Sequence, residues 1–372
     1  SIQASGIRKI FELVASMPDP INLSIGQADF DVPQPVKEAA IKAIEEGFNR
    51  YTVTQGIPEL NERIKAFLKD RYAYTPDESL VTCGVSGGLV LALLSLVNPG
   101  DEVLLPDPYF VMYKVLVDLC QGVPKYYSLY PDFRLRKEEL EQQVTTKTKL
   151  ILLNSPSNPT GSVLSPAELN CVAEVAKKHD LFVICDEIYD QFVYLDRFHS
   201  LAEYYQDKLI LLGGFSKTYG MPGWRMGYAT GPREVLDKMM VLQQFTFVCA
   251  PSFAQKAVLH ALDLDMSEYI EKYRNKRDLV YNGLKDYFDV TRPDGSFYIF
   301  PKLPAGYNGQ DFVKKAVAHN VLVVPGSAFS RQDTHFRISF AAPDDQLKKG
   351  MEILAGFAGK SGGCSCSCAC QS

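Results

Sequence analysis

The sequence predicts an α/β protein in which a large domain with a mostly parallel sheet carries a smaller α+β domain. Its 372 residues leave room for two domains of roughly 100–200 residues each. Short apolar runs alternate with amphipathic stretches from about residue 79 to 230, and this alternation is lost toward the end of the chain. The predicted division is a large domain over 29–265, a small domain over 1–28 and 266–359, and a Cys-rich flexible tail over 360–372.

The alternating part of the sequence justifies the parallel sheet. Five apolar runs are predicted to be buried strands, at residues 80–82, 102–105, 149–153, 181–185 and 209–212. Helical segments lie between them, such as 166–179, which has apolar residues at helical spacing and ends on Lys177, Lys178 and His179. Strands that alternate with helices imply a mostly parallel sheet covered on both faces.

The C-terminal part lacks this alternation and indicates the α+β domain. Its expected elements are a helix over about 267–287, a strand at 296–300, a helix near 311–319, strands at 321–324 and 335–340, and a last helix from about 344. At the other end of the chain, residues 7–15 are predicted to be helical. The N-terminal stretch has no sheet of its own, so we expect it to pack against another part of the molecule.

Composition and charge narrow the class of protein. The sequence has 39 basic and 44 acidic residues, a formal charge of −5, which argues against nucleic acid as the main partner because that usually leaves a basic footprint. No apolar run approaches the roughly 18 residues of a membrane span, so we expect no membrane partner. The sequence begins without a charged-then-apolar leader, and the start at Ser1 suggests a trimmed chain, which leaves a lost targeting segment open.

The nine cysteines fall into two groups. Five are scattered and are typical of the reduced thiols of a cytoplasmic protein rather than of a secreted disulfide framework. The others are Cys364, Cys366, Cys368 and Cys370, in the Gly-Ser-Cys tail. Their alternating spacing could gather soft metals or form disulfides, but it is not the C-x-x-C spacing of common zinc sites. The composition predicts a flexible appendage, and we expect no metal site.

Lys217 is the first candidate for chemistry. A lone lysine on a loop is most often a solvated charge. This one lies in a segment rich in Gly, Ser and Tyr, residues 213–220, just after an apolar strand. Active sites of open α/β sheets form where strands end, and the neighbouring glycines permit close approach of the backbone to a ligand. A desolvated lysine loses basicity and becomes a nucleophile that can form a Schiff base.

Polar side chains follow two other predicted strands. Asp186 comes directly after one strand, and Asn158 lies in the segment 154–161 that follows another. Both would lie near Lys217 at the carboxyl edge of the sheet. Each has a plainer interpretation: Asp186 could cap a helix with Glu187 in its first turn, and the Pro- and Gly-containing segment could be an ordinary turn.

Two more features suggest anion binding. Residues 84–88 follow a strand and open an apolar helix, which presents free backbone N–H groups and the positive helix end to an anion such as phosphate. Neither the G-x-G-x-x-G nor the P-loop spacing is present. Arg337 alternates with apolar residues in a predicted strand. It either faces solvent on an edge or points into a cleft, where its planar fork matches a carboxylate.

Taken in order, these segments resemble the class I/II aminotransferases, the pyridoxal-phosphate enzymes of fold type I. The resemblance runs from about Ile21 to Phe340. Its most specific pieces are Asn-Pro-Thr-Gly at 158–161, Asp-Glu-Ile-Tyr at 186–189, and Ser-Lys at 216–217 followed by Arg225. The implied cofactor is pyridoxal 5′-phosphate.

The resemblance implies the catalytic roles. Lys217 would hold the cofactor as a Schiff base, and its freed amine would then move the proton between the substrate Cα and the cofactor. Asp186 would pair with the pyridine nitrogen and keep it protonated. Tyr189 and Asn158 would hydrogen-bond the 3-oxygen of the ring.

The resemblance also implies how the rest of the cofactor is bound. Ser216 and Arg225 would hold the phosphate, together with the backbone N–H groups of Val85 and Ser86 at the helix start. Phe110 would stack on the ring face, at a position where other members carry Trp.

Substrate binding and assembly follow from the same resemblance. Arg337 would bind the α-carboxylate of the substrate, with Gly26 closing over it and Asn158 beside it. Tyr51 resembles the tyrosine that reaches the phosphate of the neighbouring subunit. The working unit would then be a homodimer with shared active sites.

The activity implied is transfer of an amino group from an L-amino acid to a 2-oxo acid, in a ping-pong cycle through pyridoxal and pyridoxamine phosphate. The specificity would be of the aspartate or aromatic type, or broad. One alternative is a C–S lyase or another β-eliminating enzyme of the same fold, although such lyases usually have His where Tyr189 stands. Another is a non-catalytic cofactor sensor fused to a DNA-binding module. No helix-turn-helix pattern precedes residue 20, and the chain is acidic.

Overall fold

The computed structural model describes residues 17–358, so the helix expected at 7–15 and the tail at 360–372 lie outside the described residues. Its largest feature is a sheet with the strand order β2-β8-β7-β6-β5-β3-β4. The strands are β2 (Glu78–Cys83), β3 (Glu102–Asp107), β4 (Val123–Ser128), β5 (Thr148–Asn154), β6 (Phe182–Asp186), β7 (Leu209–Gly214) and β8 (Met226–Gly231). β8 runs antiparallel to both of its neighbours and the other pairs are parallel, which confirms a mostly parallel sheet.

Both faces of this sheet are buried. In β5, Leu150 and Leu152 pack into one apolar core, whereas Ile151 and Leu153 pack into another. The helices that cover the sheet in the first core are α4 (Gly84–Leu96), α5 (Val111–Leu119) and α8 (Arg233–Thr246), and this core continues into helices of the C-terminal part. Those of the second core are α3 (Pro58–Tyr72), α7 (Pro166–His179) and α9 (Ser252–Ala261), with α2 (Gln34–Glu45) against α9 and α6 (Lys137–Glu141) against α7. Burial on both faces explains why the strands are continuous apolar runs rather than alternating ones.

The predicted helix at 166–179 has the bounds that its end signals indicated. At its start, the Ser165 hydroxyl accepts a hydrogen bond from the Glu168 N–H, and the Glu168 carboxylate accepts one from the Ser165 N–H. Pro166 occupies the first turn, where its missing N–H costs nothing. Asp180, in the left-handed conformation, ends the helix.

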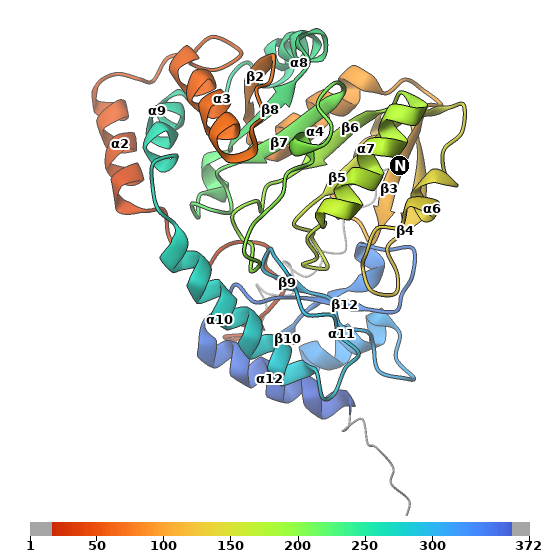
Figure 1. Cartoon of the computed structure of the whole chain (residues 1–372). Coiled ribbons are helices and arrows are strands. Elements are labelled where there is room, and N and C mark those ends of the chain that lie inside the picture. Colours follow the sequence, from red (N-terminus) through yellow and green to blue (C-terminus); the bar gives the residue numbers. More distant parts are fainter. Residues whose placement is uncertain (1–16, 359–372) are drawn as a thin grey trace, which may run out of the picture.

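The C-terminal part forms two small sheets covered by helices, which lie below the large sheet in Figure 1. Its elements are α10 (Ser267–Leu284), β9 (Tyr298–Ile299), α11 (Gly309–Ala318), β10 (Val321–Leu322), β11 (Val324–Pro325), β12 (Phe336–Ser339) and α12 (Asp344–Ala358). The sequence predicted each of these in type and place, except that the run at 321–324 splits into two strands that belong to different sheets. The domain boundaries themselves stay a prediction.

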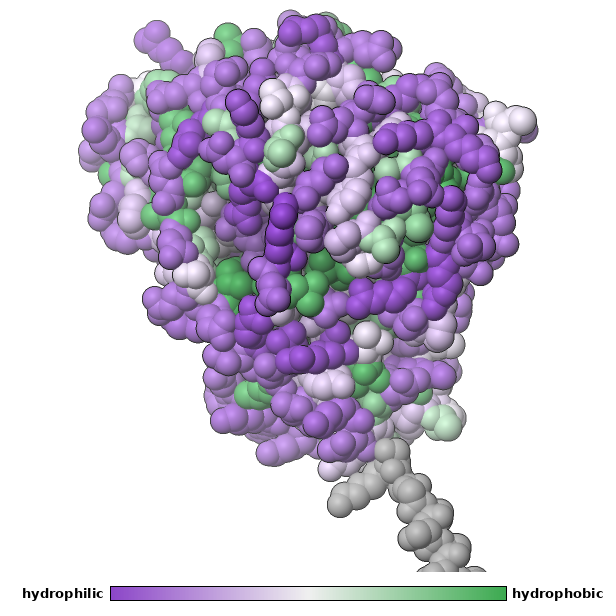
Figure 2. All heavy atoms as spheres, in the orientation of Figure 1, coloured by the Kyte–Doolittle hydropathy of each residue, from purple (hydrophilic) through white to green (hydrophobic). Residues whose placement is uncertain are grey.

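The start of the described chain joins this C-terminal part. β1 (Ile21–Asn22) pairs in parallel with β10, and β11, β12 and β9 form the other small sheet with antiparallel pairing. Most of the surface seen in Figure 2 is polar, and apolar residues gather where the large sheet's domain meets the C-terminal part. Across residues 17–358, no helix is both long and apolar enough to cross a membrane.

Candidate active site

A cavity of about 280 Å³ lies at the carboxyl edge of the large sheet, between the ends of its parallel strands and the C-terminal part. This size is close to the lower end of small-molecule sites, roughly 300 Å³. Every predicted site residue except Tyr51 lines it, namely Gly26, Val85, Ser86, Phe110, Asn158, Asp186, Tyr189, Ser216, Lys217, Arg225 and Arg337. The sheet topology thus brings together residues that are far apart in the sequence.

Lys217 follows β7 and points its amino group into this cavity. The amino group donates a hydrogen bond of 2.6 Å to the Gly26 carbonyl oxygen, and it lies 5.8 Å from the centre of the Tyr189 ring. Burial lowers the pKa of Lys217 to about 8; the positive Arg337 and Arg225 add to the effect, and Asp186 opposes it. The interpretation of Lys217 as a solvated surface charge is therefore wrong, because its amine is held inside the cavity with reduced basicity.

Asp186 is the last residue of β6 and is 3% exposed. Its Oδ2 accepts a hydrogen bond of 2.8 Å from the Tyr113 hydroxyl, and its Oδ1 accepts one of 3.2 Å from the Ile188 N–H. Burial raises its pKa to about 6, against the opposing effects of these hydrogen bonds and of Lys217. No helix starts at Asp186, so the helix-cap interpretation is wrong. At neutral pH the carboxylate is ionised and suits a cationic ring nitrogen.

Arg337, in β12, is 2% exposed and points into the cavity, so the solvent-edge alternative is wrong. Its Nη1 donates to Asn158 Oδ1 at 2.9 Å, and its Nη2 donates to the Ser24 carbonyl oxygen at 2.7 Å. Within the described residues its buried Nε has no hydrogen-bond partner. The guanidinium also lies between the rings of Tyr298 and Phe329, whose centres are 4.5 and 4.6 Å away. A buried, fixed guanidinium is suited to a carboxylate ligand.

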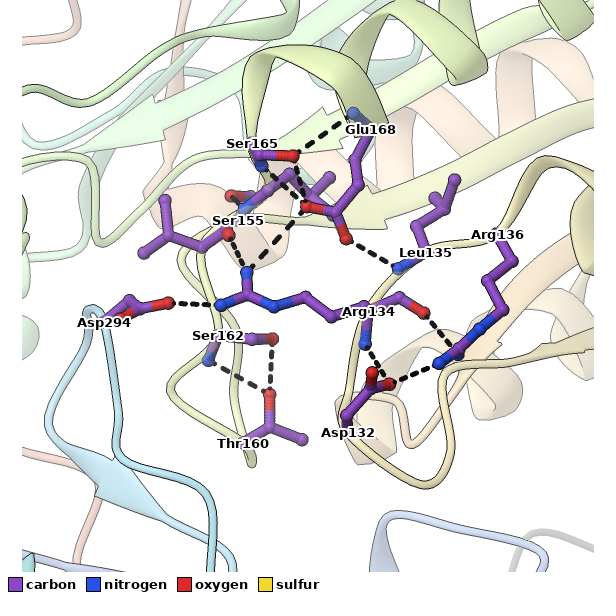
Figure 3. Close-up of polar contacts among 12 residues, drawn as sticks. Asp132, Arg134, Leu135, Arg136, Ser155, Thr160, Ser162, Ser165, Glu168 and Asp294 are labelled. Atoms are coloured by element: carbon purple, nitrogen blue, oxygen red, sulfur yellow. Dashed lines mark hydrogen bonds and ion pairs between the residues drawn. The ribbon is translucent and has the colours of Figure 1, made fainter.

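The loop after β5 that carries Asn158 forms a turn, and Asn158 also lines the cavity. As Figure 3 shows, Arg134 reaches across to it: Nη1 donates to the Val163 carbonyl oxygen at 3.0 Å, and Nη2 donates to Asp294 Oδ2 at 2.7 Å. The Asp294 N–H in turn donates to the Gly161 carbonyl oxygen at 2.9 Å. These bonds tie the loop after β5 to the segment that leads into β9, and the Arg337 Nη1 hydrogen bond holds Asn158 of the same loop.

An anion cradle lies at the start of α4. The helix begins at Gly84, whose φ of +69° is in the left-handed region, and the next residues, Val85 and Ser86, line the cavity. Arg225 lies so close that a Cβ on Gly84 would be 2.5 Å from its Nη2. Ser216, on the loop after β7, adds a hydroxyl to the lining. A helix N-terminus beside a guanidinium fits a phosphate group.

Seven lining residues were not predicted, namely Ser24, Leu89, Tyr113, Asn154, Ile188, Pro222 and Tyr298. Tyr113 projects from α5, and Tyr298 lies in the two-residue strand β9. Asn154 ends β5; its Nδ2 donates to the Asp186 carbonyl oxygen at 3.0 Å, and its Oδ1 accepts from the Asn158 N–H at 2.8 Å. The strand-end position could have identified Asn154 by the argument used for Asp186. The two tyrosines carry no such signal, because their contacts depend on how elements pack.

The lining residues fit pyridoxal phosphate on their own chemistry. They provide an amine of reduced basicity for its aldehyde, a buried carboxylate for its ring nitrogen and a cradle for its phosphate. In the described part of the chain, no cluster of three or more His, Cys, Asp and Glu residues could hold a metal ion.

Comparisons with known proteins identify one family for the chain. A family model described as aminotransferase class I and II matches residues 18–354. The chain is 40% identical over 366 residues to a probable aspartate aminotransferase of Methanocaldococcus jannaschii, with 95% of this chain and 97% of that protein covered. It is 34% identical to aromatic-amino-acid aminotransferase 2 of Thermococcus litoralis, with 95% of each covered. The structure of the aspartate aminotransferase from Rhizobium meliloti matches with a TM-score of 0.90 at 35% identity, covering 96% of each chain. The chain therefore belongs to the class I and II aminotransferases, the pyridoxal-phosphate-dependent enzymes of fold type I.

Proposed function

We propose that this aminotransferase uses the described cavity to transfer the amino group of an L-amino acid to a 2-oxo acid. The observation that carries the proposal is the meeting of Lys217, Asp186 and Arg337 in one buried space. An amine, a carboxylate and a guanidinium are the groups needed to move a proton, to stabilise a protonated pyridine ring and to bind a substrate carboxylate. We expect the preferred substrates to be of the aspartate or aromatic type, or a broad range.

Each polar group of the cavity has one task in this proposal. Bound pyridoxal phosphate supplies an aldehyde that takes up the amino group and a ring that accepts electrons from the substrate Cα. The Lys217 amine would remove the Cα proton and return it to the carbon that carried the cofactor's aldehyde, because its lowered pKa leaves much of it neutral near pH 8. The Asp186 carboxylate, held by Tyr113, keeps the ring nitrogen protonated. Tyr189 and Asn158 orient the ring oxygen.

The phosphate and the substrate carboxylate are assigned to different cations. Arg225, Ser216 and the start of α4 bind the phosphate, and Phe110 stacks on the ring. Arg337, supported by Asn158 and closed over by Gly26, binds the α-carboxylate. This division leaves no other cation of the described cavity lining for a second substrate carboxylate. A side-chain carboxylate would then have to be bound by neutral groups or by residues from outside this lining.

We propose a homodimer whose interface includes an apolar patch beside the anion cradle. The patch comprises Tyr51 and Val53, which are 84% and 51% exposed, and Phe245, Phe247 and Val248 at the end of α8 and just beyond it. Gln243, in α8, donates from Nε2 to the Thr54 carbonyl oxygen at 2.6 Å, which holds the two segments together. Exposed aromatic side chains gathered in this way are typical of interfaces. Tyr51 would cross to the phosphate of the partner's cofactor.

We also propose that the protein is cytoplasmic, because its five scattered cysteines are typical of reduced thiols.

The experiment that tests the function combines an assay with a spectrum. The protein loaded with pyridoxal phosphate is incubated with a panel of amino donors and with 2-oxoglutarate, pyruvate or oxaloacetate, and the new amino acid is measured. We expect transfer, together with an absorption band near the visible edge that Lys217→Ala abolishes. Release of pyruvate without an acceptor, and no amino acid formed with one, would instead indicate a β-eliminating lyase. A band and turnover in Lys217→Ala would show that the site assignment is wrong.

A further inference from the structure

Tyr298 is a buried tyrosine of the cavity wall to which no role has been given above. It lies in β9, is 1% exposed and lines the cavity. Its hydroxyl oxygen lies 3.0 Å from that of Tyr189, and the two rings meet edge to face at 85° with their centres 5.8 Å apart. Tyr298 is therefore hydrogen-bonded to the tyrosine that faces Lys217.

The surroundings of Tyr298 fix its hydroxyl in one place. The guanidinium of Arg337 lies 4.5 Å from the centre of its ring. On the other side, its hydroxyl faces Gly26 so closely that a Cβ on Gly26 would lie 2.6 Å from the oxygen. A buried hydroxyl with one partner within reach keeps that hydrogen bond, because leaving it unmade costs more than it gains.

The direction of this hydrogen bond follows from the cofactor position in the proposed function. Each hydroxyl has a single proton, so only one of the two can donate to the other. The proposed function has the Tyr189 hydroxyl donate its proton to the ring oxygen of the cofactor. The Tyr189 oxygen can then only accept from its neighbour, which makes Tyr298 the donor. Burial raises the pKa of both tyrosines and Arg337 opposes the rise at both, so both hydroxyls keep their protons near neutral pH.

We propose that Tyr298 is a positioning residue that donates to the Tyr189 hydroxyl oxygen and so turns the Tyr189 proton toward the phenolic oxygen of the cofactor. This inference rests on the proposed function, which places the cofactor beside Tyr189. A donor fixed before the cofactor arrives needs no reorganisation when charge develops on that oxygen. Tyr298 itself need not touch the cofactor.

Tyr298→Phe tests the inference, because it keeps the ring under Arg337 and removes only the hydroxyl. The measurement is the pH midpoint of the cofactor's visible absorption band in the loaded protein. A donor on the phenolic oxygen favours the form of the cofactor that has lost its proton, so loss of this donor raises the midpoint. We expect a rise of about half to one pH unit for Tyr298→Phe. Tyr189→Phe should shift the midpoint further in the same direction.

The double variant separates a positioning role from an independent one. If Tyr298 acts only through Tyr189, the double variant that combines Tyr189→Phe and Tyr298→Phe has the same pH midpoint of the visible band as Tyr189→Phe alone. Tyr194→Phe is the matched control, since Tyr194 is also buried and its hydroxyl donates to the Ser296 carbonyl oxygen at 2.5 Å, but it does not line the cavity. Tyr194→Phe should lower the midpoint of thermal unfolding without changing the pH midpoint of the cofactor's visible band.

Two results would overturn the inference. One is an unchanged spectral midpoint in Tyr298→Phe, and the other is a shift that persists in full when Tyr189 is already Phe. Either result, in a parent protein that shows the band and transfers amino groups, leaves the proposed function standing. A parent protein with neither band nor transfer would overturn both.

Discussion

The amino group of Lys217 is surrounded by groups that act on its proton in opposite directions. Burial and the two nearby guanidinium groups disfavour its charge, while Asp186 favours it. The net result is a pKa of about 8 for Lys217, whereas Asp186, with a pKa raised to about 6, remains ionised at neutral pH. At the residue scale the two groups therefore titrate in different pH ranges, because each lies in a different balance of burial and charge.

The first prediction concerns the pH dependence of cofactor capture by the cofactor-free protein. The neutral amine is the nucleophile, and it gains population as the pH rises through the pKa of Lys217, about 8. We expect the rate of appearance of the visible band to rise about tenfold from pH 7 toward a plateau above pH 9. Stopped-flow absorbance with pyridoxal phosphate in excess measures it. A rate that stays flat up to pH 9 would contradict this assignment.

The second prediction concerns Glu187, a buried carboxylic acid beside the site. Its Oε1 accepts hydrogen bonds from the Ser200 hydroxyl at 2.9 Å and the Leu201 N–H at 3.1 Å, and burial raises its pKa to about 8. The folded protein therefore binds more protons here than the unfolded chain between the ordinary pKa of 4.5 and about 8. The free energy of unfolding must fall as the pH rises through this window, by at most about 1.4 kcal/mol per unit.

Glu187→Gln isolates that contribution, because glutamine resembles the protonated acid and does not titrate. Urea unfolding at pH 5.5 and pH 7.5 gives the difference in stability between the variant and the parent. We expect the variant to gain on the parent between the two pH values, since all other groups titrate alike in both. An equal difference at both values would show that Glu187 is already ionised at pH 5.5.

At the scale of elements, the ends of strands and helices place the chemistry. Asn154, Asp186 and the segment after β7 lie at neighbouring strand ends, and α4 begins opposite them. Apolar runs and their flanking polar residues predict these positions, because a buried parallel strand must be apolar and its end must meet the site.

Other parts of the fold and of the site could not be predicted from the sequence pattern. β4 is an edge strand with few buried residues, and β8 joins the sheet in the antiparallel direction. Their places depend on pairing between distant segments, which no local pattern encodes. Tyr113 and Tyr298 reach the cavity through packing, and an aromatic residue on a buried helix or strand is more often part of the core.

The third prediction concerns the start of α4. Gly84→Ala puts a Cβ 2.5 Å from Arg225 Nη2, so the guanidinium must shift away from the start of α4. We expect the affinity for pyridoxal phosphate to fall about 10- to 100-fold, because a charged hydrogen bond to phosphate is lost. Equilibrium titration monitored by absorbance measures this affinity.

Gly100→Ala is the matched control for backbone strain. Its φ is +87°, also left-handed, but no atom would lie within 4 Å of the added Cβ. It should lower stability by about 1 kcal/mol and leave cofactor affinity unchanged. Equal losses of affinity in both variants would show that strain, and not the displaced Arg225, is responsible.

At the scale of the whole molecule, the exposed apolar patch is the feature that a monomer does not explain. Phe245 is 80% exposed, and Phe247 lies 3.7 Å from where a Cβ on Gly87 would be, close to the anion cradle. Covering this patch with a second copy would remove apolar surface from water and bring Tyr51 of each copy to the other. Assembly and catalysis would then be linked.

The fourth prediction follows from that link. Phe245→Asp places a charge in the proposed interface and should convert the dimer to a monomer with at least about tenfold weaker cofactor binding. Light scattering coupled to size-exclusion chromatography measures the mass, and absorbance measures bound cofactor. Leu195→Asp, at an apolar residue that is 45% exposed and outside the patch, is the control. A dimeric Phe245→Asp protein would place the interface elsewhere.

If Arg337 binds the substrate as proposed, its contact with Ser24 also governs when the enzyme can first work during its synthesis. The Ser24 carbonyl oxygen accepts its hydrogen bond from the guanidinium of Arg337, which is 313 residues later in the chain. The last strand of the large sheet, β8, leaves the ribosome well before Arg337 does, by about 5–20 seconds at typical rates of translation. A nascent chain can thus complete the large sheet while Arg337, the residue proposed to bind the carboxylate, has not yet been synthesised. On that proposal, only a chain translated through β12 would bind substrate.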